Sequence, residues 1–263
     1  MKPLPEEAAI KRPGIADYAS IARPEICAAV AASVYAAFSI YGPYMPSTPA
    51  FAALSAFLAC AGAMSFSGYL APDAPYKRTS ILMTLMFSLA GMLLSFSVSA
   101  DAPPLVAAAA IFSALYFWKL KRIVLLGNIA FAALAAIPFA SVLLSSAAPP
   151  VAAFLPACVF LVAAGTDVYR GVNSMMDGEA SASLAEKYGV NRARTVAAAF
   201  LLLAIAVSFA PFGTGLQGYV YMLFALLADM MLLAAIYFHK NTPAISAFSI
   251  VLMIAAFATG SAA

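Results

Sequence analysis

The composition of this 263-residue chain is that of a protein dissolved in lipid, because 65% of its residues are hydrophobic and only 10% are charged. A soluble domain has roughly 45 to 50% apolar and about 25% charged residues, so a soluble globular fold and a disordered chain are excluded. The formal net charge of +3 is too small to indicate a nucleic acid as a partner.

Nine apolar stretches follow one another along the chain, separated by charged residues and by Pro and Gly turn signals. A transmembrane helix takes roughly 20 apolar residues, which most of these stretches provide. The sequence therefore predicts an all-α, polytopic membrane protein, with a single nine-helix domain over residues 26–263 and an N-terminal arm over residues 1–25. The predicted spans are 26–44, 50–71, 79–100, 103–118, 123–146, 151–166, 195–212, 219–238 and 243–260.

The basic residues fall only in alternate connections between these spans. All 14 Lys and Arg residues lie in the N-terminal arm or after an even-numbered span, whereas the opposite connections hold one charge, Asp101. By the positive-inside rule, the arm and the basic connections face the cytoplasm and the C-terminus lies on the other side. We therefore expect an integral, multi-pass membrane protein with its polar groups at the cytoplasmic end.

Two cytoplasmic connections, after the second and the sixth span, carry both signs of charge. Two such clusters can converge on an anionic ligand with a divalent cation between them; the alternative is ordinary loops made soluble by mixed charge. If the sixth helix continues past Thr166, its polar residues recur on one face at intervals of three and four. Their oxygens then suit Mg²⁺, while the alternative is an intrahelical pair of Asp167 and Arg170. The residues concerned are Asp73, Lys77 and Arg78 in the first connection and Asp167, Arg170, Asn173, Asp177 and Glu179 in the second.

Four segments carry recognisable motifs: residues 115–122, 125–128, 165–179 and 189–194. They resemble motifs of the UbiA superfamily of intramembrane prenyltransferases. Residues 115–122 (LYFWKLKR) and 125–128 (LLGN) resemble the tyrosine, lysine and Gly-Asn region between the fourth and fifth helices of that family. Arg23-Pro24 resembles its usual entry into the first helix. Residues 165–179 and 189–194 resemble its second acidic motif and the basic start of its seventh helix, so the resemblance covers essentially the whole chain.

The resemblance implies a UbiA-like bundle that moves an isoprenyl group from its diphosphate to an aromatic or lipid acceptor with the assistance of Mg²⁺. Its partners would be an isoprenyl diphosphate, a hydrophobic acceptor and membrane lipids. The residues implied are Tyr116 and Lys121 for catalysis, Asp73, Asp167, Asn173, Asp177 and Glu179 for the metal, and Arg23, Lys77, Arg78, Arg122, Asn128 and Arg170 for the substrate.

The Asp-rich motifs of this chain are degenerate. In the first motif, where the family has several acids, only Asp73 remains before Lys77. In the second motif, Gly171 and Ser174 stand where acids would recur one turn apart. The basic residues in excess can bind a phosphate directly. A second hypothesis is therefore a non-catalytic UbiA-like protein, a lipid-binding or accessory subunit of a larger membrane complex.

Asp229 lies near the middle of the eighth span and favours a third hypothesis, a transporter. Inserting a carboxylate at that depth costs roughly 2.5 to 3.5 kcal/mol on insertion scales. Such a residue is therefore taken to have a function by default, for instance as a proton relay. The alternative is a carboxyl group that is protonated or hydrogen-bonded to a neighbouring helix.

Overall fold

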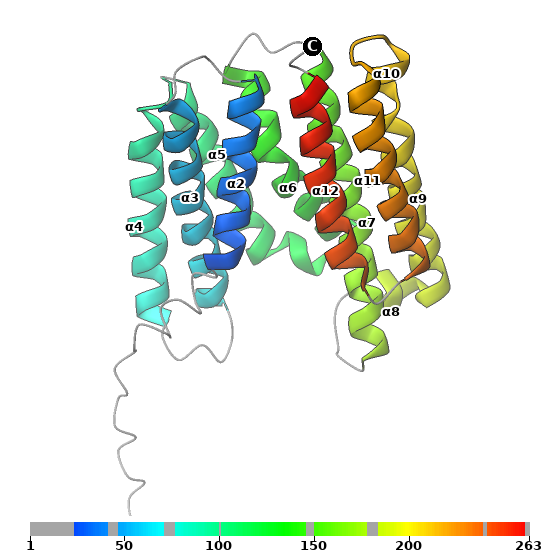
Figure 1. Cartoon of the computed structure of the whole chain (residues 1–263). Coiled ribbons are helices and arrows are strands. Elements are labelled where there is room, and N and C mark those ends of the chain that lie inside the picture. The colour runs from blue at the N-terminus through cyan, green and yellow to red at the C-terminus, as the bar shows by residue number, and fades with distance from the viewer. Residues whose placement is uncertain are drawn as a thin grey trace, which may run out of the picture.

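The chain forms a bundle of antiparallel helices, shown in Figure 1. The computed structural model describes residues 24–41, 47–70, 77–99, 101–145, 150–177, 184–238 and 241–260, and every regular element within these ranges is helical. The elements are α2 (Pro24–Tyr41), α3 (Thr48–Leu70), α4 (Lys77–Ser95), α5 (Ala102–Trp118), the 3₁₀ turn η1 (Leu120–Arg122), α6 (Leu126–Ser145), the 3₁₀ turn η2 (Pro150–Ala153), α7 (Phe154–Met176), α8 (Leu184–Tyr188), α9 (Val190–Ser208), α10 (Ala210–Gly213), α11 (Tyr219–Tyr237) and α12 (Thr242–Gly260).

Six of the described spans are long and apolar enough to cross a membrane. They are α3, α4, α7, α9 together with α10, α11 and α12, and the shorter apolar helices α2, α5 and α6 stand beside them. The predicted all-α, polytopic membrane architecture is therefore confirmed, and each predicted span falls on one of these helices. The count of nine membrane crossings stays a prediction.

Helix α7 is longer than the sequence predicts. It continues beyond the expected end at Thr166 as far as Met176. Val168, Tyr169 and Val172 keep this extension packed, because all three side chains are buried in the core. The predicted span ends at the first charged residue, whereas the helix carries polar residues on one side and apolar residues on the other. The short helix α8 is likewise absent from the prediction.

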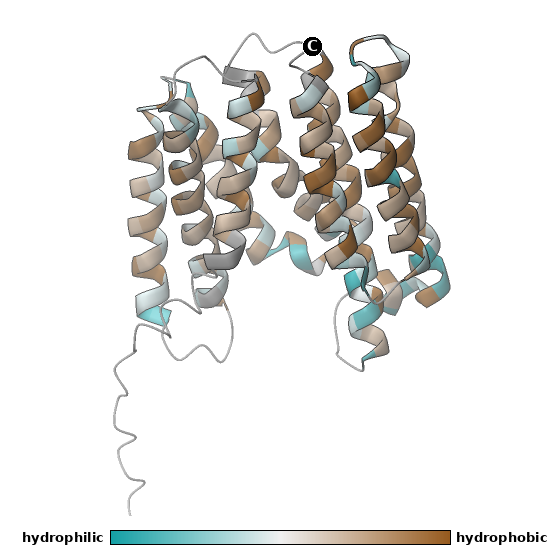
Figure 2. Ribbon diagram, viewed as in Figure 1, coloured by the Kyte–Doolittle hydropathy of each residue, from teal (hydrophilic) through white to brown (hydrophobic). Residues whose placement is uncertain are grey.

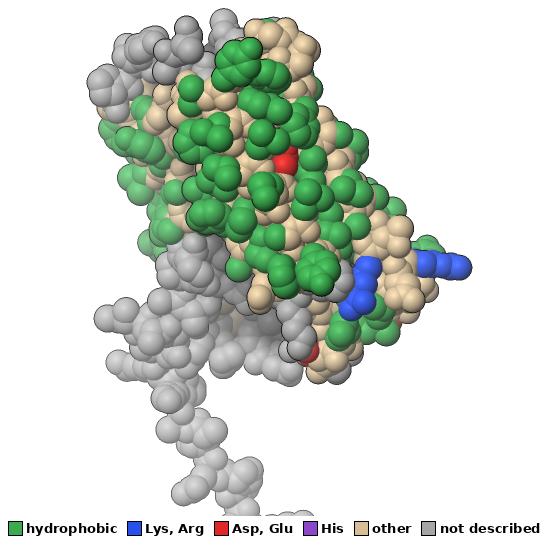
Figure 3. Space-filling view, turned by 45° about the vertical axis from the view of Figure 1, so that its right-hand side comes forward, with side chains coloured by type: hydrophobic (Ala, Val, Ile, Leu, Met, Phe, Trp, Pro, Cys, Tyr) green, Lys and Arg blue, Asp and Glu red, His purple; other side chains and the backbone are tan. Residues whose placement is uncertain are grey.

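Polar residues gather at one end of the bundle. Figure 2 shows hydrophilic residues at the lower end, where α4 begins, α7 ends and α8 lies, and hydrophobic residues along the middle of the helices. In Figure 3, hydrophobic side chains cover the upper and middle part of one outer face, and Lys and Arg appear only towards the lower end. The assignment of this end to the cytoplasm stays a prediction from the positive-inside rule.

Small residues bring α3 and α4 into close contact. A Cβ atom on Gly91 would lie 3.0 Å from the backbone nitrogen of Ala59 and 3.0 Å from the backbone oxygen of Ser55. The Ser55 hydroxyl donates a hydrogen bond of 2.8 Å to the Gly91 carbonyl. Because lipid provides little hydrophobic force between helices, such close packing and interhelical hydrogen bonds stabilise the pair.

Asp229 is hydrogen-bonded to a neighbouring helix, as one of the two sequence interpretations requires. Its side chain is 4% exposed, and the hydroxyl of Ser208 on α9 donates to its Oδ2 at 2.7 Å. Tyr221, on the same helix as Asp229, donates through its hydroxyl to the Ser208 carbonyl at 2.7 Å. Oδ1 of Asp229 has no hydrogen-bond partner among the described residues. These bonds join α9 to α11.

We expect Gly91→Ala to lower the free energy of unfolding by about 1–3 kcal/mol, because a methyl group there meets backbone atoms that cannot move aside. The measurement is the unfolding temperature of the protein in detergent. Gly213→Ala is the matched control, since a Cβ at that position meets nothing within 4 Å. Equal unfolding temperatures for the two variants would contradict the close approach of α3 and α4.

We expect Ser208→Ala to destabilise the protein by about 1 kcal/mol, because it removes the donor to a buried carboxyl group. Asp229→Asn retains an oxygen that accepts the same bond, so its unfolding temperature and expression should match those of the wild type. Ser113→Ala is the control, since the Ser113 hydroxyl donates only within its own helix, to Ala109. Loss of activity without loss of stability in Asp229→Asn would instead support a relay.

Candidate functional site

The candidate site lies where α5 turns into α6. The backbone nitrogen of Lys119 donates to the Leu115 carbonyl at the end of α5, and the turn η1 follows. Leu125 then adopts a φ of 69°, in the left-handed region that residues other than glycine rarely occupy. This conformation reverses the chain between η1 and α6. Backbone strain of this kind often occurs at functional sites.

Gly127 allows η1 to sit directly against the first turn of α6. A Cβ atom on Gly127 would lie 3.0 Å from the backbone oxygen of Leu120, 3.2 Å from that of Lys121 and 3.3 Å from the Lys121 Cα. All three are backbone positions, so a larger residue would push η1 away. The glycine therefore keeps Lys121 beside the start of α6, where Asn128 lies.

Asn128 connects this corner to α7. Its Nδ2 donates to Oδ2 of Asp167 at 2.9 Å. The positive charges of Arg170, one turn further along α7, and of Lys121 also act on the Asp167 carboxylate. Tyr116, buried on the last turn of α5, lies close enough to experience the charges of Asp167 and Arg170. Side chains from α5, η1, α6 and α7 thus converge at one point, and we call these five residues the corner cluster.

Arg170 is held by an aromatic ring. Its Cζ lies 5.7 Å from the centroid of Phe131, within the range of a cation–π interaction. The rings of Tyr116 and Phe131 are 6.4 Å apart between centroids. Phe131 is a site residue that the sequence prediction missed. The available signal is its position three residues after Asn128, which places both on one face of α6.

The other predicted site residues that the structure describes lie further along α7 or on α4. Asp177 caps the end of α7 and is exposed. It lies ten residues beyond Asp167, about 15 Å along a helix that rises 1.5 Å per residue. Asn173 is half-buried between them, and Lys77 and Arg78 are exposed at the start of α4. The side chain of Arg122 on η1 and residues Arg23, Asp73 and Glu179 lie outside the described part.

The corner cluster contains too few carboxylates for the magnesium site that the resemblance implies. Helices α5, α6 and α7 hold a single acidic residue, Asp167. No group of three His, Cys, Asp or Glu side chains that could hold a metal occurs among the described residues. One Asp167 oxygen already accepts from Asn128, and two cations compete with any metal for the carboxylate. The described residues therefore do not by themselves fit a site built from two Asp-rich motifs.

Comparison with family models and with curated protein sequences gives no match. Solved structures do match: a digeranylgeranylglyceryl phosphate synthase superposes with a TM-score of 0.75 over 93% of this chain and 97% of that chain, at 18% identity. A UbiA homologue from Aeropyrum pernix K1 gives 0.68 over 91% and 97%, at 15% identity. A UbiA homologue from Archaeoglobus fulgidus bound to DMAPP and Mg²⁺ gives 0.69 over 91% and 98%, at 15% identity.

The chain has the UbiA fold. The fold that the sequence resemblance implies is therefore confirmed along nearly the whole chain. Within the UbiA fold, the corner cluster occupies the junction where the resemblance places its tyrosine, lysine and Gly-Asn residues. At 15 to 18% identity the likeness concerns the fold, so the chemistry has to be argued from this chain's own side chains.

We expect Asn128→Ala to destabilise the protein by about 1–3 kcal/mol, because Asp167 would lose its hydrogen-bond donor in a partly buried position. The unfolding temperature in detergent is the measurement. Asn191→Ala is the control, since Asn191 is exposed at the start of α9. If both variants unfold at the wild-type temperature, the bond between α6 and α7 does not contribute to the corner cluster.

Proposed function

We propose that this chain is an intramembrane prenyltransferase that moves an isoprenyl group from its diphosphate to a hydrophobic acceptor. The observation that carries the proposal is the corner cluster itself. Lys121 and Arg170 come from two separate elements, and both charges act on Asp167 at the polar end of an otherwise apolar bundle. The charge of Arg170 also acts on Tyr116. That arrangement suits a substrate with an anionic head and an apolar tail.

The structural neighbours support the same substrate class. One is a digeranylgeranylglyceryl phosphate synthase, and UbiA homologues from Archaeoglobus fulgidus are bound to DMAPP and Mg²⁺ or to GPP and Mg²⁺. Each of these superposes over more than nine-tenths of this chain. The predicted cytoplasmic orientation of the polar end is part of the proposal, because a soluble diphosphate head would then enter from the cytoplasm.

In the proposed reaction, the bond between C1 of the isoprenyl group and the diphosphate oxygen breaks, and its electron pair leaves with the diphosphate. An electron-rich aromatic or lipid acceptor attacks C1 and later loses a proton. Lys121 and Arg170 would stabilise the negative charge that develops on the leaving group. Tyr116, whose ring packs beside Phe131, would place an electron-rich face near the allylic cation.

Magnesium is part of this proposal only through residues outside the described ranges. A divalent ion at Asp167 would need a further carboxylate, and the sequence offers Asp73 and Glu179 for that role. Bound Mg²⁺ would neutralise charge on the leaving diphosphate. Asp177 is displaced along α7 from Asp167 and would not share an ion with it.

A second candidate function is a non-catalytic lipid-binding or accessory subunit of a larger membrane complex. One observation favours it: the acid in the corner cluster is engaged by Asn128 and by two cations. Such a protein would bind the same anionic lipid without ionising it. Both functions predict binding of the same anionic lipid, and only the enzyme predicts turnover.

The purified protein in lipid nanodiscs should release inorganic diphosphate from geranylgeranyl or farnesyl diphosphate in the presence of Mg²⁺ and a suitable acceptor. Lys121→Met should reduce that rate about tenfold or more, because it removes a cation that faces the leaving group. The measurement is a coupled diphosphate assay together with detection of the prenylated product.

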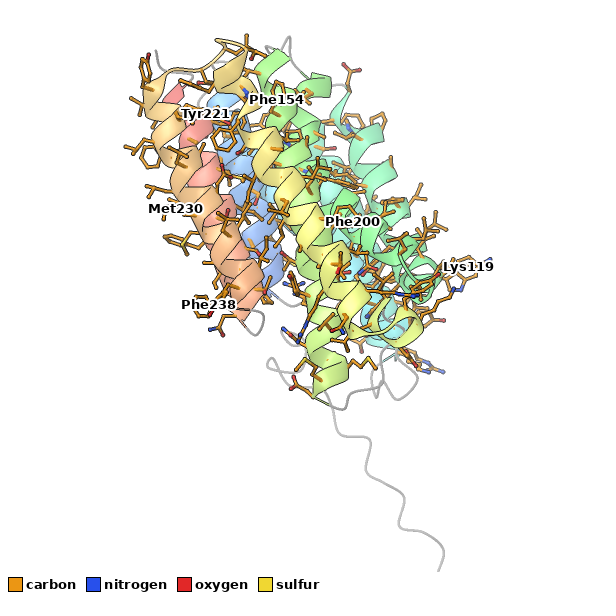
Figure 4. All side chains as sticks on the ribbon, turned by 90° about the vertical axis from the view of Figure 1, so that its right-hand side faces the viewer. Lys119, Phe154, Phe200, Tyr221, Met230 and Phe238 are labelled. Atoms are coloured by element: carbon orange, nitrogen blue, oxygen red, sulfur yellow. The ribbon has the colours of Figure 1, made fainter. Side chains whose placement is uncertain are left out.

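Lys119→Met is the matched control for this experiment. Lys119 is exposed at the end of α5, and in Figure 4 its side chain points away from the helices. It lies two residues from Lys121, so it carries the same charge without facing the corner cluster. An absence of turnover with every common chain length would reject the enzyme and favour the accessory subunit.

A further inference from the structure

We infer that the corner cluster binds the diphosphate group by direct contacts with Lys121 and Arg170, without a divalent cation. The inference rests on the proposed function for the identity of the substrate. It departs from the Mg²⁺-bound state named for the structural neighbours. Its basis is the balance of positive and negative side chains that η1, α6 and α7 bring to the corner cluster.

The charge balance of the corner cluster favours an anion over a cation. The charges of two positive side chains, Lys121 and Arg170, act on one carboxylate, Asp167. Helices α5, α6 and α7 supply no other acidic residue. A divalent cation placed at Asp167 would be repelled by both neighbours, whereas a diphosphate would be attracted to them.

Asp167 acts as a positioning residue in this arrangement. Its Oδ2 accepts from Asn128, which fixes the carboxylate against α6. The structure records no direct ion pair for Lys121 or Arg170 in the part of the chain that it describes. The carboxylate therefore attracts both cations towards the point where Asn128 holds it.

The contact of Arg170 with Phe131 directs the N–H donors of the guanidinium outward. A guanidinium that lies over an aromatic ring uses its face for that contact, and its five N–H donors point outward in the plane. Those donors match the oxygens of a phosphate in a bidentate geometry. Phe131 is itself held against Ala132, Ala163 and Ala164 where α6 packs on α7, so the guanidinium has a fixed support.

The local sequence of α7 explains why the charge has this sign. In the two turns that begin at Asp167, the positions where acids would recur hold Gly171 and Ser174, and Arg170 adds a cation. From Asp167 to Ser174 this part of α7 therefore carries one negative and one positive charge. That balance favours direct binding of an anion by basic side chains.

The experiment is calorimetric titration of the wild-type protein in nanodiscs with inorganic diphosphate, first in EDTA and then in Mg²⁺. We expect binding in EDTA and no tighter binding in Mg²⁺, because Mg²⁺ complexes free diphosphate and neutralises part of the charge that attracts it to Lys121 and Arg170. Lys121→Met and Arg170→Met should each weaken binding about tenfold or more, because each removes a charge-assisted contact. Lys119→Met should bind like the wild type.

Asp167→Asn separates a positioning role of Asp167 from a role as a metal ligand, when its binding of diphosphate is measured both in EDTA and in Mg²⁺. The amide retains the oxygen that accepts from Asn128, so the fold of the corner is preserved. As a positioning residue, Asp167 draws Lys121 and Arg170 together, so its loss should weaken diphosphate binding by the same factor in EDTA and in Mg²⁺. As a metal ligand, its loss would abolish binding in Mg²⁺.

Two results would overturn the inference: no binding in EDTA with binding restored by Mg²⁺, or a loss of binding in Asp167→Asn that occurs only in Mg²⁺. The wild-type comparison needs no variant, so it stands even if a substitution prevents folding. Binding in EDTA without turnover would reject the proposed enzyme and leave the cationic site in place. Turnover together with binding that occurs only in Mg²⁺ would support the proposed enzyme and reject metal-independent binding at the corner cluster.

Discussion

Lipid as the solvent is the constraint on which this structure depends. A polar group in the middle of a span has no water, so it needs a partner within the protein. Ser65 and Ser113 satisfy this need with a carbonyl of their own helix, and Asp229 satisfies it with Ser208 of another. Hydrophilic residues of the described helices gather at the polar end, and there the corner cluster combines both signs of charge.

The corner cluster in turn depends on backbone geometry more than on side-chain packing. Leu125 holds a left-handed conformation, and Gly127 leaves room for η1 against α6. Together they carry Lys121 back beside Asn128, which then binds Asp167 on a third helix. A few short-range steric conditions thus determine which charges meet. The long helices provide a rigid frame, because small residues such as Gly91 let them pack closely.

The sequence predicted the spans well, because length and hydrophobicity are properties of single helices. It also indicated that α7 would present Asp167 and Arg170 on one face if the helix continued, and the helix does continue. It did not predict that Asn128 bonds Asp167, that Phe131 supports Arg170 or that Ser208 binds Asp229. Such pairs depend on the rotation and tilt of two helices relative to each other, which the periodicity of either one leaves open.

The fold and the chemistry of this chain have separate physical origins. The UbiA fold rests on apolar spans and close helix contacts, which many sequences provide, and it is recognisable here at 15 to 18% identity. The proposed chemistry rests on a handful of charges at one corner, where Asp167 is the single acid that α5, α6 and α7 supply. In the proposed binding mode, Lys121 and Arg170 would hold the diphosphate there without any change to the UbiA fold. Fold and ligand chemistry are separable in this way because a fold does not determine which residues form its site.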